Sequence, residues 1–354
     1  MPLTVVSLAY PFVPIGRDTV GGTEQALAIL DQALVDDGHR SIVIGSEGSR
    51  VAGTLAETPR LADSTVPDQA MWDWAYGIHE ATLARVLREE DVDVVHLHGV
   101  DFERYLGTGA APVLATLHLP PHNYPRDVWR PHGSLRLVNC VSSYSRRQYD
   151  PFAAMAVIPY GIDLDQFRPA AGKDEFVLAL GRITPEKGFH LALDAARQAG
   201  LKLILGGKVP PFADAVRYFE EEIRPRLDAD RQFVGPIALA ERTELLARAR
   251  CVVIPSLVNE TGPLVAFEAL ASGTPVVAFA VGALPDNVDH GRTGFLVNSV
   301  EEMARAMQQA SWLDPRECRR VACARWSSER MGRDYLGLYK ALAAIGRSES
   351  ALAA

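Results

Sequence analysis

Two glutamates, Glu260 and Glu268, lie in one short segment directly after the apolar run from Cys251 to Val258, and Pro263 stands between them. Proline fits the first turn of a helix, where its missing N–H would be unpaired anyway, so the sequence predicts a helix from Pro263 through Ala271. Free N–H groups at a helix N-terminus bind anions, and nearby carboxylates accept hydrogen bonds from hydroxyl groups. The segment suits a phosphate flanked by sugars, although two ordinary surface glutamates would give the same pattern.

A pair of cations follows the first strand expected in the second half of the chain. The run GRITPEKGFHLALDA begins at Gly181, which permits a close turn, and places Arg182 and Lys187 between that strand and the next helix. Ligands bind at the carboxyl ends of strands in open α/β sheets. A guanidinium offers a planar fork and an ammonium a mobile point charge, so together they suit a diphosphate. Taken alone, the segment would be an exposed loop with two solvated cations.

Histidines end two of the expected strands in the first half. His118 follows the expected strand 113–117 and is separated from His122 by Leu-Pro-Pro. The two prolines prevent the helix that would align both rings on a zinc ion, so no metal is expected there. His96 and His98 flank a leucine at another strand end, where we expect one ring to face inward and the other outward.

The elements that must position these residues follow one alternating pattern. Short β-rich apolar runs alternate with amphipathic stretches, which is typical of parallel sheets with crossover helices. Strands are expected at residues 3–9, 41–45, 92–97, 113–117, 137–141 and 156–158, and again near 176, 201, 232, 251, 275 and 294, with helices at 22–37 and 69–90. The polar segment 163–175 separates the two series and is expected to be a linker. The sequence therefore predicts two doubly wound α/β units.

Length and composition agree with two domains. The chain has 354 residues, 48% of them hydrophobic, and the usual domain size is about 150 residues. We expect one domain over residues 1–165, a second over 166–330, and a C-terminal helix over 331–354 that packs back on the first. The side chains expected to anchor the tail are Trp312, Trp326, Met331, Tyr335 and Tyr339.

Charge and cysteine content exclude some function classes. Residues 1–172 hold 13 arginines, no lysine and 21 acids, a net charge of −8, whereas residues 173–354 balance 23 basic against 23 acidic residues. The acidic half is a poor candidate for docking on nucleic acid or anionic lipid. Four cysteines without paired spacing indicate reduced thiols, and neither a signal peptide nor a transmembrane segment is expected, so we expect a cytoplasmic protein.

Five segments in order give the chain a specific resemblance. They are IPYGIDLDQF at 158–167, GRITPEKG at 181–188, E-x7-E at 260–268, ASGTPVVAF at 271–279 and GRTGFLV at 291–297. With the N-terminal GGTEQ and GHR they cover most of the chain. The ordered set resembles the family 4 glycosyltransferases, retaining enzymes of the GT-B fold.

This resemblance implies two Rossmann-like domains facing across a cleft, with a nucleotide sugar held mainly by the C-terminal domain. Arg182 and Lys187 would bind the donor diphosphate after the turn at Gly181. Glu260 would contact the transferred sugar and Glu268 the ribose hydroxyls. Backbone groups at the helix start, from Gly262 through Pro263 and Leu264 to Val265, would meet the phosphate or sugar.

In the first domain, the resemblance places a glycine-rich loop at Gly21 and Gly22, near the donor phosphate, and His118 near the donor sugar. Glu24 would then favour the dipole of the helix that starts there. The chain departs from the family pattern at Pro263, which lacks the N–H of the usual glycine, and at Tyr160, where asparagine is usual. The role of Tyr160 stays open at this point.

Two Asp-x-Asp segments, 91–93 and 163–165, match the motif of metal-dependent glycosyltransferases. One lies in a charged run before a strand and the other in the expected linker. A GT-B enzyme can offset the charge of the leaving diphosphate with Arg182, Lys187 and helix dipoles, so neither metal nor cofactor is expected.

We therefore expect a retaining, metal-independent glycosyltransferase that moves a hexose from a nucleotide diphosphate sugar, with UDP-glucose or a similar donor expected, to a small polar or natural-product acceptor. Loops with Trp72, Trp74, Tyr124 and Trp129 could meet that acceptor, although burial is the commoner fate of tryptophan. A UDP-sugar epimerase and a non-catalytic nucleotide-sugar-binding subunit are the alternatives. A dehydrogenase is disfavoured because no G-x-G-x-x-G follows a first strand in either half.

Overall fold

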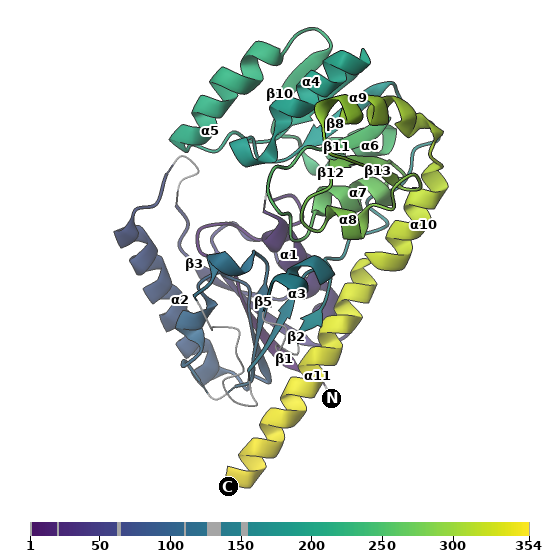
Figure 1. Ribbon diagram of the computed structural model, residues 1–354. Coiled ribbons are helices and arrows are strands. Elements are labelled where there is room, and N and C mark those ends of the chain that lie inside the picture. Colours follow the sequence, from purple (N-terminus) through teal and green to yellow (C-terminus); the bar gives the residue numbers. More distant parts are fainter. Residues whose placement is uncertain are drawn as a thin grey trace. The chain divides into compact units, whose positions relative to one another are not determined.

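The computed structural model describes residues 2–19, 21–61, 65–109, 111–125, 136–149 and 155–353. It consists of two α/β units (Figure 1). Unit 1 comprises Met1–Gly161 together with Ser328–Ala354, and unit 2 comprises Ile162–Ser327. The chain thus enters unit 2 after Gly161, ahead of the boundary expected at residue 165, and returns to unit 1 after Ser327.

Unit 1 is built on a parallel sheet of seven strands in the order β3-β2-β1-β4-β5-β6-β7. The strands are β1 (Thr4–Leu8), β2 (Arg40–Ser46), β3 (Thr54–Thr58), β4 (Val94–Leu97), β5 (Val113–Leu117), β6 (Arg136–Cys140) and β7 (Ala156–Val157). The helices are α1 (Gly22–Asp36), α2 (Gln69–Glu89), α3 (Ser143–Gln148) and α11 (Ser328–Ala353), with 3-10 turns η1 (Phe102–Tyr105) and η2 (Pro121–Asn123). The short edge strand β3 has no counterpart among the strands expected from the sequence.

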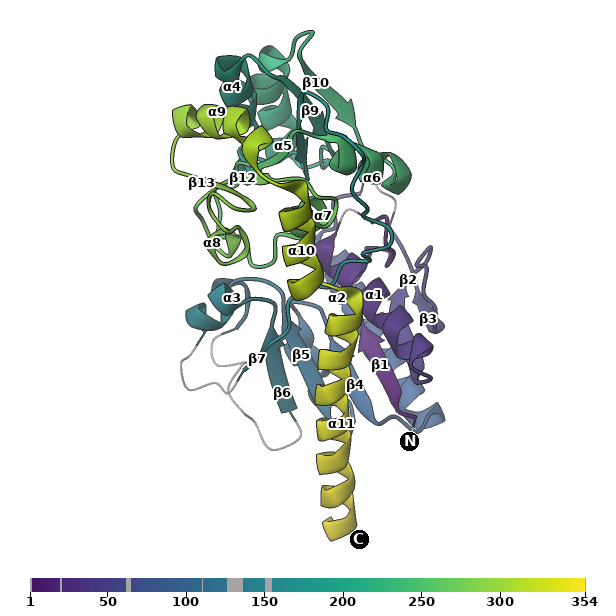
Figure 2. The same ribbon diagram turned by 90° about the vertical axis from the view of Figure 1, so that its right-hand side faces the viewer.

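Helices cover both faces of this sheet, because alternate residues of each strand point to opposite sides. In β1, Val6 and Leu8 pack in a cluster that contains Leu83 and Val86 of α2. Leu3 and Val5 face the other way, into a cluster with residues of α1 and α11. Figures 1 and 2 show α2 on one side of the sheet and α11 beside α1 on the other.

A buried polar network fastens α11 to the sheet. Thr116 donates its hydroxyl proton to Oδ1 of Asn139 at 2.7 Å, and Nδ2 of Asn139 donates to the Tyr335 hydroxyl at 3.2 Å. Because the single Thr116 proton is used there, Nε2 of His96, 2.6 Å from Thr116, must carry a hydrogen. Nδ1 of His96 then accepts from the Tyr339 hydroxyl at 2.7 Å. The network is satisfied only with a neutral His96 ring.

The two histidines at the end of β4 correct one expectation from the sequence. His96 and His98 are both buried, and their ring centroids lie 3.9 Å apart. Residues two apart on a strand point to the same face, so the predicted split of one ring inward and one outward is wrong. The anchors of the tail also differ in one case. Trp312 is 78% exposed, whereas Trp326, Met331, Tyr335 and Tyr339 are buried.

Unit 2 repeats the architecture with a parallel sheet of six strands in the order β10-β9-β8-β11-β12-β13. The strands are β8 (Phe176–Leu180), β9 (Lys202–Gly206), β10 (Arg231–Gly235), β11 (Cys251–Ile254), β12 (Val276–Phe279) and β13 (Gly294–Val297). The helices are α4 (Phe189–Ala199), α5 (Ala213–Tyr218), α6 (Leu239–Arg248), α7 (Leu264–Ala271), α8 (Leu284–Asn287), α9 (Val300–Gln309) and α10 (Pro315–Arg325). Shorter turns are η3 (Pro185–Lys187), η4 (Phe219–Ile223), η5 (Arg224–Arg226) and η6 (Ala310–Trp312).

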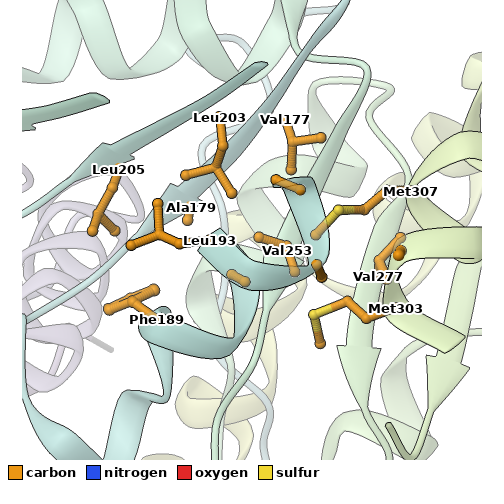
Figure 3. Packing of buried hydrophobic residues seen from close by; sticks show 14 of the residues in the cluster. Val177, Ala179, Phe189, Leu193, Leu203, Leu205, Val253, Val277, Met303 and Met307 are labelled. Atoms are coloured by element: carbon orange, nitrogen blue, oxygen red, sulfur yellow. The ribbon is translucent and has the colours of Figure 1, made fainter. Parts of the chain in front are cut away.

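The core on one face of this sheet is formed with α4 and α9. Figure 3 shows Phe189 and Leu193 of α4, together with Met303 and Met307 of α9, among strand side chains. The strand residues labelled there are Val177, Ala179, Leu203, Leu205, Val253 and Val277. These strands read as nearly continuous aliphatic runs because both faces of a parallel sheet are covered.

All four cysteines are free thiols, and three of them, Cys140, Cys251 and Cys318, are buried. Within the described ranges, no helix is both long enough and apolar enough to cross a membrane.

Replacing Tyr339 with phenylalanine should lower the free energy of unfolding of unit 1 by about 1–3 kcal/mol, because Nδ1 of His96 would be left buried without a donor. Denaturant unfolding of the full chain measures the change. Tyr144→Phe, which removes the hydroxyl of a half-buried tyrosine in α3, is the matched control. An equal effect of both substitutions would contradict the structural role of the network.

Four buried histidines in unit 1 should make stability depend on pH. Burial lowers the pKa of His79 to about 4 and that of His118 to about 3, and it holds the pKa values of His96 and His98 well below 6.5. Below pH 6.5 the unfolded chain binds protons that the folded chain does not. Stability should therefore be full above pH 7 and fall as the pH decreases, by up to about 1.4 kcal/mol per pH unit for each histidine.

The variant His79→Gln isolates one of these groups, since the His79 ring bonds only to Thr58 through Nε2, at 3.1 Å, within the described residues. Unfolding free energies of both proteins at pH 7 and pH 5.5 give the difference in slope. We expect the variant to lose less stability on acidification, by about 1 kcal/mol. Equal slopes would show that His79 is already protonated in the folded state or neutral in both states.

Candidate active site

The first observation at the site is a close ion pair between residues far apart in the sequence. Nζ of Lys187 lies 2.5 Å from Oε1 of Glu260, and the two side chains are 25% and 17% exposed. The Ser256 hydroxyl donates to the same oxygen at 2.8 Å. The structure thus joins two residues that the sequence predicted as separate binding groups, and it adds Ser256, which is 1% exposed.

Contacts between two loops hold this pair together. Lys187 ends η3, after β8, and Glu260 lies in the loop after β11, a neighbour of β8 in the sheet. The N–H of Leu257 donates to the carbonyl of Glu186 at 2.8 Å, which docks one loop on the other. Gly188 has a φ of +66°, and a Cβ there would lie 2.2 Å from the carbonyl oxygen of Pro255. Only glycine permits this approach.

A third segment fixes the backbone of Glu260. The N–H of Ala283 donates to the Glu260 carbonyl at 2.7 Å. Gly282 has a φ of +59°, and a Cβ there would lie 2.4 Å from the nitrogen of Glu260. The carboxylate of Glu260 is therefore aimed by its neighbours on both sides rather than free in a flexible loop.

The start of α7 differs slightly from the expectation. Pro263 is the N-cap and not the first helical residue, because α7 begins at Leu264. The N–H of Leu264 donates to the carbonyl of Gly262 at 2.9 Å, so it is not available to an anion in this structure. Pro263 has no N–H, which leaves Gly262 and Val265 as the positions in this run that could meet a phosphate or sugar.

Arg182 lies apart from the ion pair. It is exposed at the end of β8, directly after Gly181, and within the described residues no carboxylate pairs with it. An exposed guanidinium at the carboxyl edge of the sheet is able to turn toward an incoming anion. The structure does not bring Arg182 into contact with Lys187 or Glu260.

Glu268 is held by a residue that the sequence did not single out. Glu268 is 2% exposed, and its carboxylate lies 3.2 Å from the guanidinium of Arg242 in α6. Burial raises the pKa of Glu268, and Arg242 acts in the opposite direction. Nothing in the local sequence around Arg242 indicates this contact. The signal for Ser256 was clearer, since it is the single polar residue within the apolar run 251–258.

In unit 1, the glycine-rich loop leads directly into α1. Gly21 is the N-cap and Gly22 the first helical residue. Glu24 is buried, and its carboxylate folds back over Gly21, where a Cβ would lie 1.7 Å from Oε2. The carboxylate thus lies at the positive end of the helix dipole. A phosphate that approaches Gly22 would meet this negative charge.

The structure gives Tyr160 a definite contact. Its hydroxyl lies 2.8 Å from Nδ1 of His118, and the two rings stack with centroids 5.8 Å apart. Nε2 of His118 lies 3.2 Å from Nδ1 of His98. Burial lowers the pKa of His118 to about 3. The His118 ring is therefore neutral near pH 7 and has both nitrogens engaged within unit 1, so it is not a general base in this arrangement.

The two Asp-x-Asp segments have structural partners. Asp93 accepts hydrogen bonds from the N–H of Thr4 at 2.9 Å and from Arg347 at 2.8 Å. Asp163 caps a turn, where Oδ1 accepts from the N–H of Asp165 at 3.1 Å. Within the described ranges, no group of three or more histidine, cysteine or acidic residues could hold a metal ion.

Unit 2 therefore presents a cation, a carboxylate and the start of α7 together, with Arg182 exposed nearby on the chain. A doubly negative group could draw Lys187 away from Glu260, which would release the carboxylate to accept hydrogen bonds from hydroxyls. This exchange of partners is the chemistry expected for a sugar joined to a diphosphate.

Comparisons with known proteins agree with this chemistry. Residues 174–311 match the family described as "Glycosyl transferases group 1", and residues 20–166 match "Glycosyltransferase Family 4". The D-inositol 3-phosphate glycosyltransferase of Mycobacteroides abscessus is 38% identical over 161 residues, which are 42% of this chain and 36% of that protein. The chain thus spans about a third of the length of that relative.

Longer matches have lower identity. A GDP-mannose-dependent alpha-(1-6)-phosphatidylinositol monomannoside mannosyltransferase of Mycobacterium tuberculosis is 28% identical over 276 residues, covering 65% of this chain and 69% of the relative. The structure of AviGT4, a glycosyltransferase involved in Avilamycin A biosynthesis, is similar with a TM-score of 0.72 and 25% identity, over 97% of this chain and 98% of that one.

The fold is also that of the sucrose-phosphate synthase of Thermosynechococcus elongatus, with a TM-score of 0.79 and 21% identity over 97% of this chain and 100% of that one. The two family matches follow the order of the sequence motifs and fall on successive halves of the chain. The chain belongs to family 4 of the glycosyltransferases and has the GT-B fold.

Proposed function

We propose that this glycosyltransferase moves a hexose from a nucleotide diphosphate sugar to an acceptor hydroxyl, with retention of configuration and without a metal ion. The observation that carries the proposal is the pair of Lys187 and Glu260, 2.5 Å apart and aimed by three converging loops. The pair supplies one group for the phosphates and one for the sugar.

In the first step, the diphosphate of the donor takes Lys187 from its carboxylate partner, and Arg182 adds a second cation. Both then offset the charge that develops on the leaving phosphate oxygen as the bond to the anomeric carbon breaks. These cations stand in for the divalent ion that other glycosyltransferases use. The proposal therefore needs no metal.

Glu260 then binds hydroxyls of the hexose. Ser256 keeps its hydrogen bond to Oε1 at 2.8 Å and so holds the carboxylate in one rotamer when Lys187 moves. Fixed acceptors place the anomeric carbon without the entropy loss of ordering a free side chain during the reaction. Glu268, paired with Arg242, is proposed to bind the ribose hydroxyls.

Bond changes at the sugar balance without a protein base. The bonding electrons leave with the diphosphate, and the acceptor oxygen bonds to the anomeric carbon from the same face. The acceptor proton passes to the departing phosphate oxygen. The neutral ring of His118 is consistent with this scheme, because it takes no proton near pH 7.

UDP-glucose is the first donor to test. GDP-mannose is the second, because one relative is named as GDP-mannose-dependent. The acceptor is proposed to be a small polar molecule, and the site of action the cytoplasm. The likeness to a glycosyltransferase of avilamycin biosynthesis supports a natural-product acceptor as a class to test.

Lys187→Met and Glu260→Gln should each lower kcat/KM by on the order of 100-fold, since each removes one contact to the reacting groups. Steady-state kinetics with the active donor measures the loss. Lys202→Met is the matched control, because Lys202 is exposed at the amino end of β9, the opposite end from the site. If both site variants turned over like the control, the site assignment would be wrong.

Glu268→Gln should weaken nucleotide binding by about 10-fold or more through loss of charged hydrogen bonds to the ribose. Calorimetric titration with UDP, GDP, ADP and NAD, without added metal, identifies the nucleotide. Product analysis without an acceptor separates transfer from epimerisation. A protein that bound one nucleotide but never turned over its sugar would instead be a binding subunit.

A further inference from the structure

The carboxyl ends of β1 and β4 form a second place in unit 1 where a ligand could bind. These strands are neighbours in the sheet, but the chain continues from β1 toward β2 and β3, and from β4 toward β5, β6 and β7. Such a reversal of strand order leaves a crevice between the loops, where ligands of open α/β sheets bind. The proposed function uses none of the residues at this point.

Four aromatic rings gather there, and we name Tyr10, Phe12, Trp72 and Tyr76 the aromatic platform. Tyr10 and Phe12 follow β1, while Trp72 and Tyr76 lie in the first turns of α2. The ring centroid of Trp72 lies 5.3 Å from that of Tyr10, 4.8 Å from that of Phe12 and 5.8 Å from that of Tyr76. Trp72 is thus central to the platform.

The platform differs from the aromatic core beneath it. All four rings of the platform are half-buried, whereas Phe102 and Tyr105 of the adjacent η1 turn are 1% and 3% exposed. Phe12 also has a φ of +73°, the single positive φ of a non-glycine residue within the described part of the chain. Backbone strain of this kind costs about 1–3 kcal/mol and is maintained mostly at functional sites.

Carboxylates with unused hydrogen-bonding capacity lie beside the rings. Asp101 is 5% exposed, and its Oδ2 accepts from the Tyr105 hydroxyl at 2.7 Å. Within the described residues, Oδ1 of Asp101 has no hydrogen-bond partner. It lies beside Gly99, where a Cβ would be 2.0 Å from Oδ1 and 3.5 Å from the Tyr10 ring. This buried, unpaired oxygen is therefore next to the platform.

The same segment after β4 carries two more atoms of this kind. Nε2 of His98 and Oε2 of Glu103 are buried and lack a partner among the residues that the structure describes. Burial and the charge of the nearby Asp101 raise the pKa of both Tyr10 and Tyr76. Buried polar atoms that remain unpaired call for a water or a ligand, since native proteins satisfy nearly all of them.

The combination selects one class of ligand. Aromatic faces pack against the C–H face of a saturated ring, and unpaired carboxylate oxygens accept hydrogen bonds from its hydroxyls. One cation, Arg104, lies 4.3 Å over the Tyr76 ring, but the three carboxylates of Asp101, Glu103 and Glu24 outnumber it, so the local charge disfavours a phosphate. We propose that the aromatic platform and Asp101 form the acceptor subsite, and that the acceptor is a neutral polyhydroxylated ring, a sugar or a cyclitol. This inference rests on the proposed function and specifies its acceptor.

Donor consumption by the full-length protein tests the ligand class. The probes are myo-inositol and methyl α-D-glucopyranoside as neutral rings, inositol 3-phosphate as the charged ring, and glycerol as the open-chain polyol. A neutral ring should raise consumption above the rate of donor hydrolysis and should yield a glycosylated product. Preference for inositol 3-phosphate or glycerol, or no stimulation by either neutral ring, would overturn the proposal.

Substitutions then locate the subsite. Trp72→Ala and Asp101→Asn should each raise the KM for the ring by about 10-fold. Trp74→Ala is the matched control, because Trp74 lies in the same helix at 47% exposure but contributes no ring to the platform. A Trp72 variant with the KM of the control would rule out the platform. If Trp72→Ala also lost donor hydrolysis, the KM values of Trp72→Phe and Asp101→Asn for the ring would decide whether the platform binds the acceptor.

A donor-free measurement separates this inference from the proposed function. Titration of the protein with myo-inositol or methyl α-D-glucopyranoside, followed by tryptophan fluorescence, should give a signal that Trp72→Phe abolishes and Trp74→Phe retains. If the protein bound no donor but still gave this signal, the proposed function alone would be refuted. Suppose instead that the wild-type protein turned over donor but neither neutral ring gave a fluorescence signal or a glycosylated product. That outcome would refute the acceptor subsite alone.

Discussion

The site in unit 2 depends on the docking of two loops from neighbouring strands. One hydrogen bond between Leu257 and Glu186, and the close approach of Gly188 to Pro255, bring an ammonium and a carboxylate from distant parts of the sequence to 2.5 Å. A parallel sheet makes this possible, because loops that follow adjacent strands emerge at the same edge. The two charges are therefore already assembled before a ligand binds.

In unit 1, burial keeps a group of histidine rings neutral. The rings of His96, His98 and His118 lie together in the interior and are held neutral by burial. The hydroxyl of Tyr339 is bonded to His96 and that of Tyr160 to His118. In unit 2, by contrast, Lys187 and Glu260 remain partly exposed, where a ligand can exchange partners with them. The two units share a fold but differ in the charges that follow their strands: carboxylates such as Glu24 and Asp101 in unit 1, and the cations Arg182 and Lys187, together with Glu260, in unit 2.

The sequence predicted the architecture well because buried parallel strands leave a strong local signal, as in the runs at Val113–Leu117 and Cys251–Ile254. It missed β3, an edge strand with mixed polarity, and it misplaced Trp312, whose aromatic character says nothing of exposure. At the site, Lys187 and Glu260 were predicted by type and position, but their pairing was not. Arg242 and the contact of Tyr160 with His118 depend on which elements meet, information that no short segment contains.

The return of the chain to unit 1 through α11 has a consequence for synthesis on the ribosome. Unit 2 is continuous from Ile162 to Ser327 and can close its core as soon as it has emerged. The sheet face with Leu3 and Val5 must wait for α11, which is made about 170 residues later than the last strand of that sheet. During this interval an aliphatic surface of unit 1 is open to water, so unit 1 begins to be made before unit 2 but is completed after it.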